Sequence, residues 1–130
     1  MATEVIKSKL LPSFENVGIA HAVRNGNFVF ISGQIPLDSD GNIVGKGDVR
    51  AQTVQIYEIL KGVLEEIGGS LINIVKLTTF YVNPDEFSVM AEVRKSYFST
   101  GQLAASSAFC VTALAHPDAL VGVEAIAILD

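Results

Sequence analysis

Residues 48–82, DVRAQTVQIYEILKGVLEEIGGSLINIVKLTTFYV, decide the fold because the hydrophobic pattern changes its period within them. The first part has apolar residues at helical spacing, at Ile56, Leu60, Val63, Leu64 and Ile67. Asp48 is a typical N-cap and Gly68-Gly69 a typical stop, so this part predicts an amphipathic helix. Residues 74–82 are rich in β-branched and aromatic side chains, which predicts a strand directly after the helix.

Strands are also expected at both ends of the chain. Residues 20–24 and 28–32 flank Asn25-Gly26-Asn27, and Asn-Gly is a strong hairpin signal. Asn83 and Pro84 begin a second helix that runs to about residue 98, and strands near 107–111 and 121–128 follow it. This order predicts one α+β domain over residues 1–130, a mixed sheet with two helices packed on one face. The other face would need cover, which favours an oligomer.

Composition and charge exclude several classes of partner. Hydrophobic residues make up 49% of the chain and charged residues 18%, so we expect another subunit to cover part of the surface. The net charge is −5 and the cations are scattered, which argues against nucleic acid as a partner. No apolar run is long enough to span a bilayer, and Cys110 is the only cysteine. We therefore expect a cytoplasmic protein without a disulfide.

No motif for a metal or a nucleotide is visible. The sequence contains no phosphate-binding loop and no dinucleotide fingerprint. His21 and His116 lie in different contexts and do not have metal-ligand spacing, so we expect no metal site.

Glu124 breaks the pattern of the last predicted strand. Alternation places Gly122, Glu124, Ile126 and Ile128 on one face. A carboxylate among apolar neighbours costs free energy unless it is paired, so Glu124 is a candidate functional residue. Two structural roles explain it equally well: a place on a solvent-facing edge, or an ion pair across an interface.

Arg94 breaks the apolar stripe of the second helix, which carries Phe87, Met90, Ala91, Tyr97 and Phe98. An arginine in this position is able to bind a carboxylate through two hydrogen bonds. The more common role is to lay its aliphatic stem on the apolar face while the charged end reaches water.

The segment FVFISGQIPL, residues 28–37, resembles the RidA/YjgF family of reactive-intermediate (enamine/imine) deaminases. The likeness continues through the first helix and its glycine end, and it returns at residues 74–82 and 120–127. The resemblance implies a chorismate-mutase-like fold and a homotrimer in which the sheets form a central barrel. It also implies three clefts for a small metabolite at the subunit interfaces, and a reaction without a cofactor.

The family residues carry over only in part. In the family an arginine holds the substrate carboxylate, a Ser-Gly-Gln turn assists, and a glutamate positions the attacking water. Ser32-Gly33-Gln34 stands at the turn, and Glu124 stands at the glutamate. The family pattern Pro-x-Arg-Ser is replaced by residues 104–107, AASS, and an ungapped count from Glu124 places Ser106 at the arginine position. Ser106, Ser107 and Arg94 are therefore candidate ligand contacts.

Two hypotheses follow for the function. The first is hydrolytic deamination of a reactive enamine or imine, with a specificity altered by Ser106 and with Arg94 as a substitute cation. The second is a non-catalytic ligand-binding or regulatory trimer that keeps the clefts; Ile19 and Ala91, which replace polar family residues, favour it. Ribonuclease activity, a label that some relatives carry, fits poorly with the acidic charge.

Overall fold

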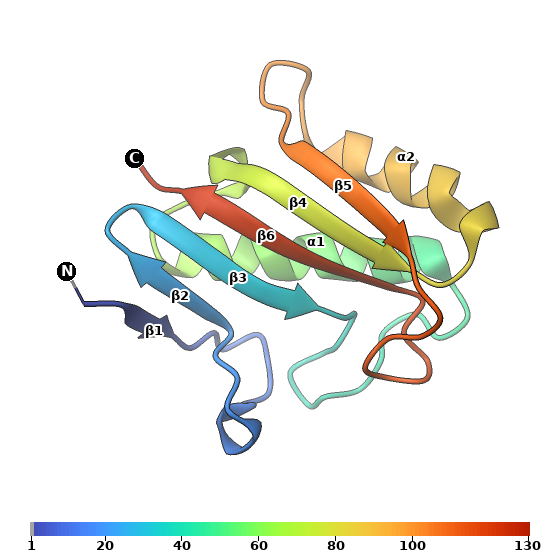
Figure 1. The fold of residues 1–130 in the computed structure, drawn as a ribbon, viewed down its shortest axis with the longest axis horizontal. Helices are drawn as coiled ribbons and strands as arrows, with labels where there is room; N and C mark the ends of the chain where they lie inside the picture. The colour runs from blue at the N-terminus through green and yellow to red at the C-terminus, as the bar shows by residue number, and fades with distance from the viewer. Residues whose placement is uncertain (1) are drawn as a thin grey trace.

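The computed structural model describes residues 2–130 and contains one six-stranded sheet and two long helices (Figure 1). The helices are α1 (Val49–Glu66) and α2 (Phe87–Tyr97). The strands are β1 (Glu4–Ile6), β2 (Ala22–Asn25), β3 (Phe28–Gln34), β4 (Ile74–Tyr81), β5 (Ala105–Cys110) and β6 (Val121–Ile128). Short 3-10 turns occupy Glu15–Val17, Leu71–Asn73 and Pro84–Glu86. The predicted α+β order is confirmed.

The sheet is mixed, and its strand order is β1-β2-β3-β6-β4-β5. All neighbouring strands are antiparallel except β4 and β5, which are parallel and are joined by α2. A parallel pair needs such a crossover because its strands start at the same edge of the sheet. β6, the last strand in chain order, therefore lies between β3 and β4 in the middle of the sheet (Figure 1).

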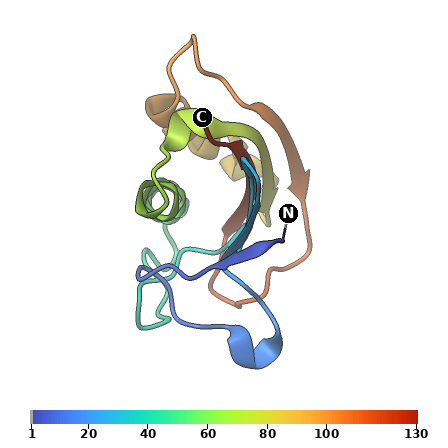
Figure 2. The same cartoon turned by 90° about the vertical axis from the view of Figure 1, so that its left-hand side faces the viewer.

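Both helices cover the same face of the sheet, as the sequence predicted (Figure 2). The core lies between this face and α1, where Ile56, Leu60 and Val63 are fully buried. The sheet contributes alternate residues to the core, among them Val29, Leu77, Val121 and Val123. The opposite face carries no helix, and we call it the open face. Several of the large apolar side chains exposed to solvent belong to its strands: Val5, Phe28, Phe30, Phe109 and Ile128.

Local signals explain where α1 begins and ends. The Asp48 carboxylate accepts a hydrogen bond from the backbone N–H of Ala51 at 3.1 Å, which satisfies one free donor of the first turn. After Glu66 the chain turns through Gly68, whose φ of 84° is in the left-handed region that favours glycine. None of the helices in residues 2–130 is long and apolar enough to cross a membrane.

Two elements differ from the prediction. The second helix starts later than expected: Asn83 caps the 3-10 turn Pro84–Glu86 through the N–H of Asp85, and α2 begins only at Phe87. β1 was not predicted as a strand. It has three residues at the edge of the sheet and buries only Ile6, too little for an alternating pattern.

Candidate functional site

A β-bulge places Glu124 beside the Ser-Gly-Gln turn. Ile31 of β3 pairs with Ala125 of β6, and Gln34 pairs with Val123. Two residues of β3, Ser32 and Gly33, therefore lie opposite the single residue Glu124. Bulges of this kind are frequent next to active sites because they change the direction of one strand and leave backbone groups unpaired. The structure thus brings together the turn and the carboxylate that the sequence analysis had singled out.

The turn itself is held by hydrogen bonds. The Ser32 hydroxyl donates to the carbonyl of Ala20 at 2.6 Å, and the Ser32 N–H donates to the carbonyl of His21 at 3.0 Å. The Gln34 side chain is buried and donates to the carbonyl of Ser32 at 2.9 Å. These bonds fix the backbone of the turn, and they make Gln34 a residue that positions Ser32.

A pocket of about 240 Å³ lies between this turn and the chain before β2. Its lining is largely apolar: Phe14, Ile19, Ala20, His21, Ser32, Gly33, Gln34, Ile35, Leu37 and Ala115. Pockets for drug-sized ligands usually measure about 300–1,000 Å³, so this one suits a smaller molecule. Its walls favour an apolar side chain on that molecule.

His21 lines this pocket, but both of its ring nitrogens make hydrogen bonds to the backbone. Its Nδ1 accepts a hydrogen bond from the N–H of Ser8 at 2.9 Å, and its Nε2 donates to the carbonyl of Pro12 at 2.7 Å. Both ring nitrogens are therefore engaged by the backbone, and neither is free to act as a general base. Glu124 is thus a better candidate for that role.

A row of polar side chains crosses the open face at the level of Glu124. Thr78 of β4 pairs with Glu124 on one side and with Ser107 of β5 on the other. Lys76, two residues before Thr78, faces the same way and donates from Nζ to the Ser107 hydroxyl at 2.8 Å. Glu124 is exposed, and Lys76 and Ser107 are half-buried. A cation, two hydroxyls and a carboxylate therefore share one surface.

Lys76 is a candidate site residue that the sequence analysis did not single out. It was counted only among the scattered cations, although it stands in a strand of otherwise apolar and threonine residues. A lysine in an interior strand is unusual, because charged groups are seldom placed where both neighbouring strands crowd them. The sequence signal was a lysine within a predicted strand. Its importance became clear only from the strand order, in which β4 lies between β6 and β5.

Ser106 does not face the candidate site. It pairs with Leu77, which is 1% exposed and points into the core under the helices. Because side chains alternate along a strand, Ser106 lies on the helix side and Ser107 on the open face. Within one chain, Ser106 and Glu124 therefore lie on opposite faces of the sheet, because a shift of one residue along a strand moves a side chain to the other face. Ser107 is the serine that shares a face with Glu124, and the role of Ser106 as a ligand contact stays a prediction.

Arg94 is also on the helix side of the sheet. It is half-buried in a separate pocket with Leu77 and Phe98, and this pocket shares no residue with the one at Ser32. Burial raises the pKa of the neighbouring Tyr57 to about 12, and the Arg94 charge opposes this rise. Within one chain Arg94 therefore does not join Glu124, and Lys76 is the cation on the Glu124 side.

Within residues 2–130, no cluster of three or more histidine, cysteine, aspartate or glutamate side chains is arranged to hold a metal ion. The polar groups that gather at the site are a carboxylate, an ammonium group and hydroxyls. Such groups bind and orient a small polar molecule and transfer protons to and from it.

Comparison with known proteins places this arrangement in a family. Residues 17–129 match the family model described as endoribonuclease L-PSP. The chain is 38% identical over 128 residues to a RutC family protein of Pyrococcus abyssi, covering 98% of both chains. It is 32% identical over 107 residues to the 3-aminoacrylate deaminase RutC of Acinetobacter baylyi, covering 82% of each.

Solved structures agree with the sequence comparison. The Rid family protein YyfA of Yersinia pestis matches with a TM-score of 0.90 at 32% identity, over 98% of this chain and 100% of that one. The fold, the family model and the relatives therefore lead to one conclusion: the chain belongs to the RidA/YjgF/RutC family, in which some members are named as deaminases.

Proposed function

We propose that this protein hydrolyses the C=N bond of a small, mainly apolar imine, or of the enamine in equilibrium with it, to a carbonyl compound and ammonia. The observation that carries the proposal is the bulge that sets Ser32 and Gly33 opposite Glu124, next to an apolar pocket. The relative named as 3-aminoacrylate deaminase supports the reaction class.

In this mechanism Glu124 activates water. Its carboxylate accepts a proton as the water oxygen attacks the imine carbon, and the nitrogen takes up a proton to give a carbinolamine. The carbinolamine then loses ammonia and becomes the carbonyl compound, so one imine and one water give one carbonyl compound and one ammonia. Ser32 and Gly33 hold the reacting group opposite the carboxylate, which converts the attack into a step between positioned partners.

Lys76 supplies the charge that the family arginine supplies elsewhere. Its ammonium group is fixed beside Ser107 on the open face, within reach of a carboxylate that lies along the row of Ser107 and Thr78. A lysine is a point charge and lacks the flat fork by which arginine grips both carboxylate oxygens. The carboxylate of a substrate is therefore held less rigidly, and specificity for α-imino acids is relaxed.

The working unit of the proposal is the homotrimer that the family resemblance implies. The open face carries exposed Phe28, Phe30 and Ile128 on neighbouring strands, and a contiguous apolar surface of this kind is normally covered. In a trimer built on this face, Glu124 and Lys76 lie at the subunit boundary, where water is partly excluded. The interactions of both charges become stronger in such a place.

The test is ammonia release from freshly generated 2-iminopropionate by the wild type and by Glu124→Gln. We expect the wild type to exceed buffer clearly and the variant to lose about 10²–10⁴-fold, the usual contribution of a general base. Glu65→Gln, at an exposed position of α1, removes the same charge elsewhere and should keep full activity. A wild-type rate equal to buffer, or equal rates for both glutamate variants, would rule out hydrolysis through Glu124.

A second function, ligand binding without catalysis, is favoured by one observation. The pocket at Ser32 carries Ile19, where the family resemblance implies a polar residue, and the structure shows no arginine on the open face among residues 2–130. If the wild type is inactive and small apolar metabolites raise its Tm, this function replaces the first.

A further inference from the structure

A hollow of about 470 Å³ lies beside α1, the helix that Figure 2 shows on the side of the sheet opposite the open face. It is about twice as large as the pocket at Ser32, and its volume falls within the usual range for ligand sites, about 300–1,000 Å³. The proposed hydrolysis uses none of its lining. That lining comes from α1 between Gln55 and Glu65, from the N-terminal residues Lys9 and Leu10, and from the turn residues Asp38 and Ser39.

Hydrogen bonds fix both flanking walls of the hollow to α1. The Gln55 amide donates to the carbonyl of Leu37 at 2.8 Å, which holds the turn after β3 against one end of the hollow. At the other end, the Glu66 carboxylate accepts from the N–H of Lys9 at 3.1 Å and from the Ser8 hydroxyl at 2.6 Å. The hollow is therefore formed before a ligand arrives, and binding does not have to order its walls.

The floor of the hollow is apolar. Ile59 is 2% exposed, and Gly62 has no side chain there. Leu10 lies against α1 in the space that a Cβ at position 62 would take, yet it remains 40% exposed. An apolar side chain of a ligand that covers Leu10 and Ile59 removes this surface from water, which favours binding.

Opposite charges lie at the two ends of the hollow. The end at the turn after β3 carries the carboxylates of Asp38 and Glu58, and the end at the N-terminal segment carries the ammonium group of Lys9. Lys61 and Glu65, one turn apart on α1, contribute opposite charges that compensate each other. No ion pair among residues 2–130 involves any of these five side chains. A molecule with a positive group at one end and a negative group at the other complements this arrangement.

The two carboxylates at the turn accept hydrogen bonds only from neutral donors. Asp38 accepts from the N–H groups of Asp40 and Asn42, each at 2.9 Å. Glu58 accepts from the Tyr97 hydroxyl at 2.7 Å. Within the described part of the chain, no cation therefore balances the two negative charges, and an ammonium group is the favoured partner for them.

The length of the hollow limits the ligand. Along α1 the lining runs from Gln55 to Glu65, which is about 15 Å at the usual rise of about 1.5 Å per residue. A fully extended peptide of four residues spans about 13 Å. We propose that the hollow binds a short free peptide of about four residues, with its terminal ammonium at Asp38, its terminal carboxylate at Lys9 and an apolar side chain on Leu10. The site shares no residue with the hydrolytic site, so it does not rest on that function.

The test is calorimetric titration of the full chain with the tetrapeptide Ala-Leu-Ala-Ala, with its N-acetyl form, with its C-terminal amide and with free leucine. Each blocked peptide lacks one terminal charge, and leucine is too short to reach both ends. We expect the free peptide to bind about three- to fivefold more tightly than either blocked form, the contribution of one solvent-exposed ion pair, and more tightly than leucine. Added salt should reduce this difference.

Variants of the two ends test the orientation of the peptide. Asp38→Asn keeps an acceptor for the turn and removes the charge, so it should weaken the free peptide about three- to fivefold and leave the acetylated peptide unchanged. Lys9→Gln should weaken the free peptide in the same way and leave the amidated peptide unchanged. Asp85→Asn and Lys95→Gln remove the same charges at exposed positions far from the hollow in sequence, and both should bind like the wild type.

Several results would overturn the site: no binding of the free peptide at millimolar concentration, equal affinity of the blocked peptides, or equal effects of Asp38→Asn and Asp85→Asn. If Asp38→Asn does not fold, Lys9→Gln and the blocked peptides decide the question alone. No imine is present in these titrations. A negative result therefore leaves the hydrolysis untouched, and an inactive enzyme leaves the peptide site untouched.

Discussion

Ser106 and Ser107 are neighbours in the chain but lie on opposite sides of the sheet, and only Ser107 shares a side with Glu124. An arginine at 107 would present its fork to a carboxylate on the open face, whereas an arginine at 106 would point towards the helices. We expect Ser107→Arg to raise kcat/KM for 2-iminopropionate about tenfold or more, and Ser106→Arg to leave it at or below the wild-type value.

The two variants carry the same substitution at neighbouring positions that face opposite sides of the sheet, so each is the control of the other. Ammonia release under identical conditions compares them directly. A gain in Ser106→Arg alone would mean that the family arginine acts from the helix side and that the open-face site is misassigned.

The role proposed for Lys76, attraction of a substrate carboxylate, depends on its place on the open face beside Ser107. Replacing it with methionine keeps the aliphatic stem and removes the charge. We expect Lys76→Met to raise KM for 2-iminopropionate about tenfold with little change in kcat, because the lost attraction acts on the bound carboxylate before the reaction. Steady-state kinetics measure both constants.

Lys61→Met, at an exposed position of α1, supplies the control for the loss of one positive charge. If both variants shift KM equally, the effect is general electrostatic attraction and Lys76 does not contact the substrate. An imine without a carboxylate should be unaffected by Lys76→Met.

At the scale of elements, one glutamine ties α1 to two loops. Gln52 is fully buried; its side-chain amide donates to the carbonyls of Gly45 at 3.1 Å and Asp118 at 2.9 Å, and its oxygen accepts from the N–H of Leu120 at 2.8 Å. Gln52→Ala leaves these buried groups unpaired and should cost about 2–3 kcal/mol of unfolding free energy. For a domain of this size the Tm should fall by roughly 10 °C.

Gln55→Ala is the matched control for that measurement. Gln55 lies one turn along the same helix, is half-buried and makes a single hydrogen bond, to the carbonyl of Leu37 at 2.8 Å. Thermal unfolding followed by circular dichroism should show a clearly smaller loss for Gln55→Ala. Equal losses would mean that the cost comes from the helix itself and not from the loops that Gln52 holds.

The elements were predictable from sequence to the extent that their signals are local. Asp48 and the glycine after α1 mark that helix because capping and left-handed backbone depend on single residues. β1 escaped prediction because a three-residue edge strand is defined by its partner β2 and not by its own pattern. The strand order, which places Lys76 and Ser107 beside Glu124, depends on pairing between distant segments, and no single segment records it.

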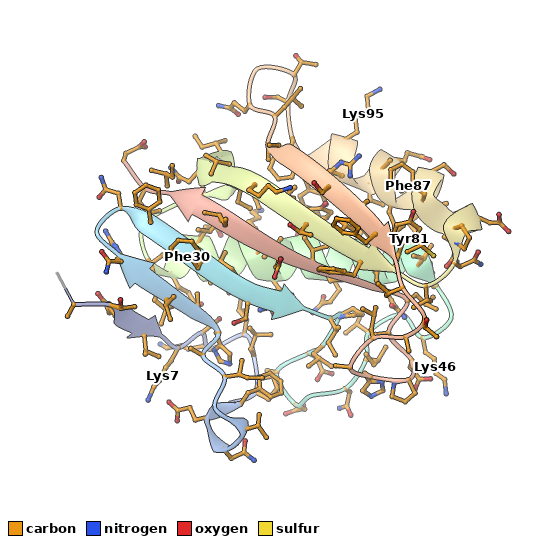
Figure 3. The ribbon with its side chains drawn as sticks, in the orientation of Figure 1. Lys7, Phe30, Lys46, Tyr81, Phe87 and Lys95 are labelled. Carbon is orange, nitrogen blue, oxygen red and sulfur yellow. The ribbon has the colours of Figure 1, made fainter. Side chains whose placement is uncertain are left out.

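At the scale of the whole molecule, the open face is the proposed contact between subunits. Figure 3 shows Phe30 on the side of the sheet turned away from α1, where it is 46% exposed. We expect Phe30→Lys to convert the proposed trimer to single chains, because a lysine on each of three facing sheets adds repulsion and removes apolar burial. Light scattering coupled to size-exclusion chromatography gives the mass directly.

Val54→Lys provides the comparison on the helix side. Val54 is 38% exposed on α1, and a lysine there should leave the mass unchanged. If Phe30→Lys keeps the wild-type mass and a native circular dichroism spectrum, the open face is not the contact between subunits. Deamination by the single chains at the full wild-type rate would instead show that the site is complete without a neighbour.

The central place of β6 has a consequence for the order in which the protein is made. Every other strand leaves the ribosome before β6, yet β3 and β4 have no shared edge until β6 lies between them. A growing chain therefore carries two separate half-sheets with exposed apolar edges, and such species need protection by chaperones. The same late strand carries Glu124, so a chain whose synthesis stops early lacks both the centre of the sheet and the proposed general base.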